Sequence, residues 1–304
     1  MSGWARSALV VLAVLGGPSA SAQTAPGPPM IPLAPRPPAP PAPPCDPTWR
    51  EVARPPPDAS PHGAWIVTGG RIVWVGWGYA AVRASDGTWA AADPSRVPAI
   101  ALDDRRRIVF SHALARGHEV YVVGTRLTVL RYDGTWHLEH RDLAQGERRT
   151  HAARLETCDG RLRAIAHGVG IERRDDGTWA RLPRAALRAC EAPRLEAPRP
   201  SERCGNWMPG LRIASCAAGR RLWSVRRARW LPLPDEMRVR RWATVIEHDD
   251  GIDLVDDDGV IQHSPDGTHW QSQSLPAPAL RLSIDGSRLY APTDDALYAR
   301  DVCR

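Results

Sequence analysis

The stretch RYDGTWHLEH, residues 131–140, contains a tetrapeptide that returns along the chain. Asp-Gly-Thr-Trp occurs at 86–89, 133–136 and 176–179, and a near copy, Asp-Gly-Thr-His-Trp, occurs at 266–270. Asp-Gly flanked by alternating apolar residues indicates a type I′ turn, in which both residues take a positive φ, between two antiparallel strands. The tetrapeptide therefore predicts a β-hairpin in which a tryptophan follows the turn and can pack on a neighbouring sheet.

Two further strand-like runs precede the hairpins; in the first unit they are AWIVT (64–68) and RIVWVG (71–76). The tryptophans in the repeat register lie 40 to 51 residues apart, at positions 49, 89, 136, 179, 230 and 270. Four strands per unit at this period are typical of propeller blades, which must stack because each blade alone leaves both sheet faces bare. We expect an all-β fold, a six-bladed β-propeller of four-stranded antiparallel blades. Two β-sandwich domains are the alternative, but they would not need this period.

The hairpin with Asp, Gly and a following Trp resembles the Asp-box of sialidase-like and related bacterial propellers. The fuller box carries Ser or Thr ahead of the Asp and an extra residue before the Gly, so SPDGTHW (264–270) is the nearest match. The unit that ends at Trp230 reads RRARW and has lost the Asp-Gly pair. In that family the Asp-box is a structural hairpin, so the resemblance implies a fold and not hydrolysis.

Sialidase-like enzymes would imply an arginine cluster, a tyrosine nucleophile and acidic partners at the central channel. The five tyrosines of this chain fall on expected second or third strands, and none falls on an innermost strand. No catalytic residue can therefore be carried over from the resemblance, and enzymatic activity is less expected than binding.

The ends of the propeller are expected to meet in one blade. The last unit has only three strand-like runs, Leu280–Ile284, Arg288–Thr293 and Ala296–Asp301, whereas CDPTWREV (45–52) imitates the end of a repeat with no strands before it. The N-terminal segment should therefore supply the outer strand of the last blade, which removes two unpaired edges. This pairing predicts a Cys45–Cys303 disulfide; the alternative is a free thiol at Cys45. We expect Cys190 to pair with Cys204, and Cys158 with Cys216.

The N-terminal 44 residues are not expected to belong to the propeller. Residues 1–22 read as a signal peptide, with Arg6, a short apolar run at Ala8–Leu15 and the cleavage-site pattern Ala20-Ser21-Ala22; a buried helix is the alternative. Residues 23–44 are a Pro/Ala-rich linker of polyproline character, either a spacer or a tail with no role. The propeller domain then covers 45–304. We expect an exported protein, periplasmic or extracellular, with no transmembrane segment; six cysteines fit an oxidising compartment.

The basic composition is weak evidence for nucleic acid, and none is expected as a partner. All 40 basic residues are arginine, there is no lysine, and the net charge is +6, which is typical of a GC-rich bacterial genome. Three stretches could bind a metal or an anion, namely His137 with Glu139, Asp256–Asp258, and RRLWSVRRARW (220–230). A solvated strand edge, a plain Asp258-Gly259 turn and a solvated outer face are the favoured interpretations. We expect no metal and no cofactor.

The favoured function is binding: a monomeric, non-enzymatic module that recognises a protein or an envelope glycan. A glycan-cleaving propeller and a purely structural envelope scaffold are the alternatives. Recognition sites usually lie on long loops held by a rigid frame. Here the long segments 92–107, 141–152 and 183–209 share a face with the loops between second and third strands. The residues expected to bind on that face are Trp77, Arg126, His167, Asp257 and Asp294.

Overall fold

The computed structural model describes residues 45–59, 63–92, 108–141, 153–166, 168–188, 204–208, 213–216, 219–234, 237, 244–256 and 258–303. The chain divides into two compact units, Met1–Pro43 and Pro44–Arg304, and all described residues lie in the second. The predicted signal peptide and linker lie outside the described residues. Among the described residues, no helix has the length and apolar character that a membrane crossing requires.

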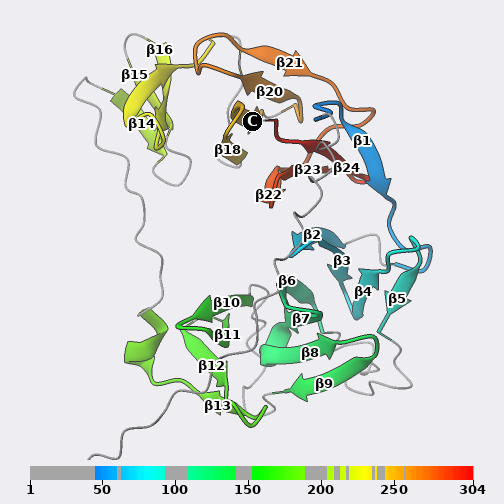
Figure 1. Ribbon diagram of the computed structural model, residues 1–304. Helices are drawn as coiled ribbons and strands as arrows, with labels where there is room; N and C mark the ends of the chain where they lie inside the picture. Colours follow the sequence, from blue (N-terminus) through cyan, green and yellow to red (C-terminus); the bar gives the residue numbers. More distant parts are fainter. Residues whose placement is uncertain are drawn as a thin grey trace, which may run out of the picture. The chain divides into compact units, whose positions relative to one another are not determined.

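The described fold is all-β, as predicted, and consists of six four-stranded antiparallel sheets (Figure 1). Five sheets are formed by strands that are consecutive in the chain. The first two contain β2 Ala64–Thr68, β3 Arg71–Gly76, β4 Tyr79–Arg83 and β5 Trp89–Ala91, then β6 Phe110–Arg116, β7 Glu119–Gly124, β8 Thr128–Tyr132 and β9 Trp136–His140. The third contains β10 Arg154–Cys158, β11 Arg161–Ala166, β12 Val169–Arg173 and β13 Trp179–Arg181.

The fourth sheet contains β14 Cys204–Met208, β15 Ile213–Cys216, β16 Gly219–Ser224 and β17 Arg229–Pro232, and the fifth contains β18 Thr244–His248, β19 Gly251–Val255, β20 Ile261–Ser264 and β21 Gln271–Gln273. The sixth sheet combines the two ends of the unit in the order β1 Arg50–Ala53, β24 Leu297–Asp301, β23 Arg288–Pro292 and β22 Ser283–Asp285. Two short 3₁₀ turns, η1 Thr125–Leu127 and η2 Arg184–Arg188, lie between strands.

The Asp-Gly hairpins are present, but the type I′ turn is wrong. In the first hairpin the Gly87 amide donates to the Ala84 carbonyl at 3.0 Å, and the Ala84 amide donates to the Thr88 carbonyl at 2.8 Å. Gly87 has a φ of +88°, whereas Asp86 has no positive φ. The loop therefore contains three residues, a type I turn closed by a left-handed glycine, which is the next commonest way to join two twisted strands.

The hydrogen bonds of the aspartate side chain explain why the same four residues recur along the chain. Asp86 Oδ1 accepts hydrogen bonds from the Thr88 amide at 2.9 Å and from the Thr88 hydroxyl at 2.6 Å. These two bonds lower the pKa of Asp86. Asp176 binds Thr178 in the same way, at 2.8 and 2.6 Å. The hydrogen bonds between aspartate and threonine thus stabilise the loop, and glycine adopts the left-handed backbone conformation. The tryptophan is the first residue of the last strand.

The unit that lost the Asp-Gly pair keeps a related turn. Between β16 and β17 the Ala228 amide donates to the Val225 carbonyl at 3.4 Å. This bond spans three residues, like the bond from the Gly87 amide to the Ala84 carbonyl in the first hairpin. Ala228 takes a φ of +48°, in the left-handed region that a Cβ disfavours. The exposed Ala228 therefore carries backbone strain that the glycines of the other hairpins avoid.

Neighbouring sheets are joined by five buried apolar clusters. The first combines Val73 and Val82 of the β2–β5 sheet with Phe110 and Val122 of the β6–β9 sheet. The other four combine β6–β9 with β10–β13, β14–β17 with β18–β21, β18–β21 with the sixth sheet, and the sixth sheet with β2–β5. Within the described ranges, none of these clusters combines β10–β13 with β14–β17. The clusters thus join four of the five pairs of sheets that are consecutive in the chain, and one cluster joins the last sheet to the first, as expected of stacked repeats.

Repeat-register tryptophans add a polar contact between outer strands. The Trp136 indole nitrogen donates to the Ala90 carbonyl of the preceding sheet at 3.0 Å, and the Trp270 indole nitrogen donates to the Pro232 carbonyl at 3.3 Å. The Trp49 indole nitrogen donates to the Gln273 side-chain oxygen at 2.7 Å. The tryptophan therefore does pack on a neighbouring sheet, as predicted.

The sixth sheet joins the N-terminal segment to the last three strands. Strand β1 pairs antiparallel with β24, and Arg50 lies opposite Ala299; Figure 1 shows blue β1 beside dark red β24. The predicted Cys45–Cys303 disulfide is present at the end of this pair. Asp46 also repeats the hydrogen bond of the hairpin aspartates, because its Oδ1 accepts from the Thr48 amide at 2.9 Å. Cys158 and Cys216 each form a disulfide, and the Cys158–Cys216 and Cys190–Cys204 pairings stay predictions.

Candidate functional site

The turns between second and third strands meet at neighbouring sheet ends. The Gly78 amide, which follows Trp77, donates to the Ile108 carbonyl at 2.6 Å, and the Thr125 amide donates to the Val109 carbonyl at 3.0 Å. The segment 108–109 thus hydrogen-bonds to the Trp77 turn on one side and to the Arg126 turn on the other. Trp77 has an exposed fraction of 49%. Of the five residues predicted to bind, His167 and Asp257 lie outside the described residues.

The Arg126 turn holds two residues in a disfavoured conformation. Arg126 has a φ of +59° and Leu127 a φ of +49°, although neither is glycine, and the Thr128 amide closes the turn on the Thr125 carbonyl. A left-handed residue with a Cβ costs about 1–2 kcal/mol. Leu127 is fully buried and anchors this turn, so the strain fixes the direction in which Arg126 leaves the backbone. Backbone strain of this kind is frequent at functional sites.

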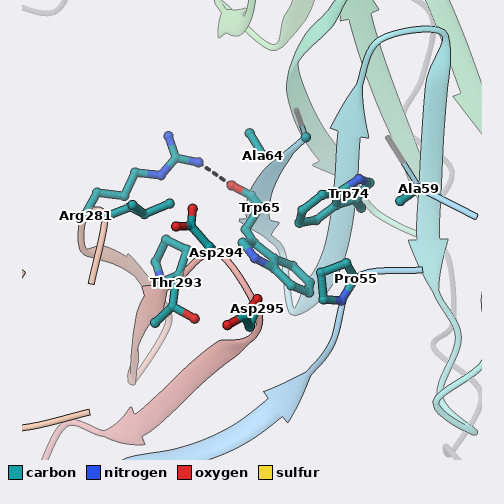
Figure 2. Close-up of a pocket in the computed structure, with 12 residues that line it drawn as sticks. Pro55, Ala59, Ala64, Trp65, Trp74, Arg281, Thr293, Asp294 and Asp295 are labelled. Carbon is teal, nitrogen blue, oxygen red and sulfur yellow. Dashed lines mark hydrogen bonds between the residues drawn. The ribbon is translucent and has the colours of Figure 1, made fainter. Parts of the chain in front are cut away.

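Asp294, the third described residue, lies on the turn between β23 and β24 and lines a cavity of about 510 Å³ (Figure 2). The opposite wall comes from the start of β2 and the end of β3, including Trp65 and Trp74. Ala64 lies in register with Val75, two residues before Trp77, so the cavity and the Trp77 turn are at the same end of the β2–β5 sheet. A cavity of this volume is within the usual range of ligand sites.

Two indole rings form the inner wall of the cavity. Trp65 and Trp74 are cross-strand neighbours whose ring centroids lie 4.8 Å apart, edge to face. They are only 3% and 4% exposed, and neither indole nitrogen finds an acceptor within the part of the chain that the structure describes. Gly63 passes so close that a Cβ at this position would lie 2.2 Å from the Trp74 ring. A side chain at residue 63 would therefore displace this ring.

The cavity rim is mainly acidic. Asp294 and Asp295 are both exposed at its mouth, whereas the Arg281 guanidinium is turned to the Trp65 carbonyl and donates to it (Figure 2). Burial lowers the pKa of Arg281. Of the described residues, the rim thus carries two carboxylates and one guanidinium, and that guanidinium already has an acceptor.

A second polar cluster lies in the core between β18–β21 and β24. Asp253, fully buried, contacts His248 and accepts from the Arg300 guanidinium at 2.5 Å, and its other oxygen lies 3.2 Å from His263 Nδ1. Burial alone would raise the pKa of Asp253, but the hydrogen bonds with both histidines and the charge of Arg300 lower it to about 2. Asp250 receives a further hydrogen bond from Arg300 at 3.2 Å.

This second cluster has the donor types of a metal site but a different electrostatic role. Ligand atoms of His248, Asp253 and His263 all lie within 4.8 Å of one another, a set that suits a transition metal. However, an Arg300 nitrogen lies 2.5 Å from Asp253 and 3.5 Å from His263 Nδ1. The guanidinium therefore supplies the positive charge that the carboxylate needs, and it would repel a metal ion. We assign this cluster to the packing of β24 on the fifth sheet.

The other sequence candidates are engaged in local structure. Glu139 accepts from Arg131 at 2.6 Å and from Arg173 at 3.2 Å, an ion-pair network that also lowers its pKa against the opposing effect of burial. Asp256 Oδ1 accepts from the Asp258 and Val260 amides, as a plain turn requires. In the arginine run, Arg226 pairs with Asp249 at 2.9 Å and Arg227 donates to the Pro265 carbonyl.

Sequence reasoning missed most of the cavity. It found Asp294 from its position in the repeat, but it did not select Trp65, Trp74, Arg281 or Asp295. One signal was present, since Trp65 and Trp74 lie outside the tryptophan repeat register and face each other across two adjacent predicted strands.

Comparisons with known proteins give no family for this chain. No protein-family model matches the sequence, and no curated protein matches it. Solved structures that resemble the fold include YCF48 bound to D1 peptide, with 15% identity, a TM-score of 0.48, and coverage of 84% of this chain and 97% of that chain. YCF48 from Cyanidioschyzon merolae has 12% identity, a TM-score of 0.47 and coverage of 83% and 98%. The WD40 β-propeller domain of Doa1 has 8% identity, a TM-score of 0.39 and coverage of 84% and 96%. All three TM-scores lie below 0.5.

Proposed function

We propose that this chain is an exported, non-enzymatic six-bladed β-propeller of the Asp-box type, and that it acts as a binding or scaffold module for a protein or a surface glycan. Six four-stranded antiparallel sheets, five of them built from consecutive strands, support the propeller. Further support comes from the cluster that joins the sixth sheet to the first and from the sheet shared by both ends of the unit. The protein acts as a monomer and needs no cofactor.

The cavity beside Asp294 carries the binding proposal. A buried hydrogen-bond donor without an acceptor costs about 1–3 kcal/mol, and two indole donors of the cavity wall have no acceptor in the described part of the chain. The cavity lies at the sheet end that also carries the exposed Trp77 turn, and segment 108–109 connects that turn to Arg126. A partner seated across these turns would satisfy the donors and cover Trp77, and the proposed face would extend to His167 and Asp257.

Hydrolysis of a glycan is the alternative, and the cavity gives it little support. Glycosidases place two carboxyl groups on either side of the scissile bond. Asp294 and Asp295 are consecutive residues of a single turn, and the facing wall contributes Trp65, Trp74 and Pro55. The carboxylates therefore approach a bound ligand from one side, which suits recognition of a charge.

The proposal is tested by comparing the chain with two matched variants. The full chain is immobilised and exposed to an extract of its own cell envelope and, separately, to a glycan array. The Trp77→Ala/Arg126→Ala variant alters the proposed face, and the Leu138→Ser variant alters an exposed residue of the outer strand β9. We expect a protein or glycan that the wild type and Leu138→Ser retain and the face variant loses.

Retention that depends on Leu138 and not on Trp77 and Arg126 would place the partner on the hairpin rim and contradict the proposed face. Retention by none of the three proteins would contradict the binding function itself. Release of reducing sugar from a retained glycan would support the enzymatic alternative. Circular dichroism and thermal unfolding of each variant ensure that a loss of retention is not a loss of folding.

A further inference from the structure

The cavity between the Asp294 turn and the β2–β3 tryptophans also indicates the chemistry of its ligand. The argument rests on the proposed binding function and concerns which class of partner the site accepts. Three features of the cavity bear on the ligand: the unpaired indole donors, the acidic rim and the orientation of the aromatic rings.

The indole donors require a hydrogen-bond acceptor. Trp65 and Trp74 keep their N–H groups more than nine-tenths buried with no acceptor among the described residues. Figure 2 shows the Trp65 nitrogen on the side of Thr293 and Asp294, toward the cavity. An indole nitrogen only donates, so the complementary ligand atom is an oxygen such as a main-chain carbonyl.

The rim requires a positive charge. Asp294 and Asp295 carry two negative charges at the mouth, and Arg281, a guanidinium that lines the cavity, donates to the Trp65 carbonyl. Charge complementarity across an interface suppresses partners of the wrong sign and raises the association rate. An arginine or lysine side chain beside these carboxylates meets this requirement.

The orientation of the rings favours a peptide over a sugar. A sugar that stacks on an aromatic residue needs an exposed ring face, but Trp65 and Trp74 pack edge to face against each other and are almost fully covered. What the two residues can offer there is the Trp65 N–H donor and apolar ring edges, next to Pro55 and Pro292. These groups suit an extended main chain, whose carbonyls are regularly spaced.

We propose that this cavity binds an extended segment of a partner protein in which an arginine or lysine side chain contacts Asp294 and Asp295 while a neighbouring carbonyl accepts from Trp65. This selects a basic peptide among the partners of the proposed function. Binding should weaken as salt increases, because the carboxylates are exposed and their charges are screened.

Two synthetic hexapeptide libraries test the proposal, one with a fixed central arginine and one with a fixed central glutamate, the other positions being random. Each is titrated into the full chain, labelled with ¹⁵N, and the indole N–H resonances are followed. We expect the arginine library to shift the Trp65 resonance and to bind at least about tenfold more tightly than the glutamate library. A tenfold change corresponds to about 1.4 kcal/mol.

Variants test the contribution of the two carboxylates separately from that of the indole hydrogen-bond donor. Asp294→Asn/Asp295→Asn should weaken the arginine library about tenfold or more, and Trp65→Phe should weaken it while leaving its salt dependence unchanged. Asp175→Asn removes an exposed carboxylate from the β12–β13 hairpin and should have no effect. Equal binding of both libraries, or binding that the double variant leaves unchanged, would overturn the proposal. If no peptide binds but an envelope partner still depends on Trp77 and Arg126, the basic-peptide inference is wrong and the binding function stands.

Discussion

At the scale of single residues, the hairpin position with a left-handed backbone conformation should be more stable with glycine than with any other residue. Gly177 has a φ of +83°, and a Cβ there would meet only the Arg173 side chain at an ordinary 3.4 Å, so the cost of a side chain is conformational. We expect Gly177→Ala to lower the free energy of unfolding by about 1 kcal/mol. Ala228→Gly should raise it by up to about 1 kcal/mol, since it relieves existing strain. Urea unfolding of both variants checks the opposite signs, and a destabilised Ala228→Gly would disprove the strain at Ala228.

A second prediction at this scale concerns Asp253. Its folded-state pKa of about 2 lies below the ordinary value of 3.8, so the ionised carboxylate is favoured by folding. This contributes about 2 kcal/mol of stability, fully present above pH 4 and lost as the pH falls toward 2. We expect Asp253→Asn to cost about 3 kcal/mol at pH 7, because Arg300 and His248 lose the fully buried one of the two carboxylates that they contact. The difference in unfolding free energy between wild type and variant should shrink between pH 4 and pH 2, and a difference that stays constant would contradict this role. Leu138→Ser, which changes an exposed residue and removes no titratable group, is the control.

The sequence predicts residue roles well where a role depends on neighbours in the chain. The Asp-Gly-Thr-Trp pattern identifies a turn because aspartate, glycine and threonine act within three residues of one another. It did not show the turn type, since the loop begins one residue before the aspartate, at Ser85. Asp253 and Arg300 are 47 residues apart in sequence, so no local pattern predicts their contact.

At the scale of elements, the tryptophan that follows each hairpin should differ in its contribution from sheet to sheet. Trp136 donates to Ala90 at 3.0 Å, whereas the buried Trp179 nitrogen finds no acceptor among the described residues. We expect Trp136→Phe to cost about 1 kcal/mol, the net value of a hydrogen bond, and Trp179→Phe to be neutral or slightly stabilising, because it removes an unpaired donor. Chemical denaturation of the two variants distinguishes the cases, and an equal loss in both would show that ring size alone matters.

Strand positions were predictable because alternation and turn residues are local signals. The predicted runs 64–68 and 71–76 coincide with β2 and β3, and the predicted last three strands differ from β22–β24 by a few residues at their ends. The irregular fourth unit was less predictable. Its hairpin has no Asp-Gly pair, and Glu247 from the next sheet supplies the carboxylate that the Ser224 hydroxyl and the Val225 amide bind.

At the scale of the whole molecule, the cross-link between the first and last strands should make a large contribution to stability. It joins residues separated by 258 positions, and the Gly69 and Gly70 amides, which donate to Asp285, add a second link between the first and sixth sheets. We expect Cys45→Ala/Cys303→Ala to lose about 2–5 kcal/mol. Thermal unfolding measures the loss. Peptide mapping of the unreduced wild type should recover Cys45 linked to Cys303, and recovery of Cys45 in any other state would contradict the structure.

The sixth sheet was predictable from the number of strands in each repeat. The last repeat has three strands, and the N-terminal segment around Trp49 resembles the fourth strand of a repeat, so the two together complete one sheet.

The same cross-link has a mechanical consequence. When the chain is pulled by a handle before Cys45 and a handle after Cys303, the tension passes through the disulfide. The chain between the two cysteines, which are 258 positions apart in sequence, then bears no load. Stretching the oxidised protein in an optical trap should release no contour length from the sheets. In the Cys45→Ala/Cys303→Ala variant the same force should separate β1 from β24 first and then extend the rest of the unit. The folded unit can thus connect two attachment points without unfolding under the tension between them.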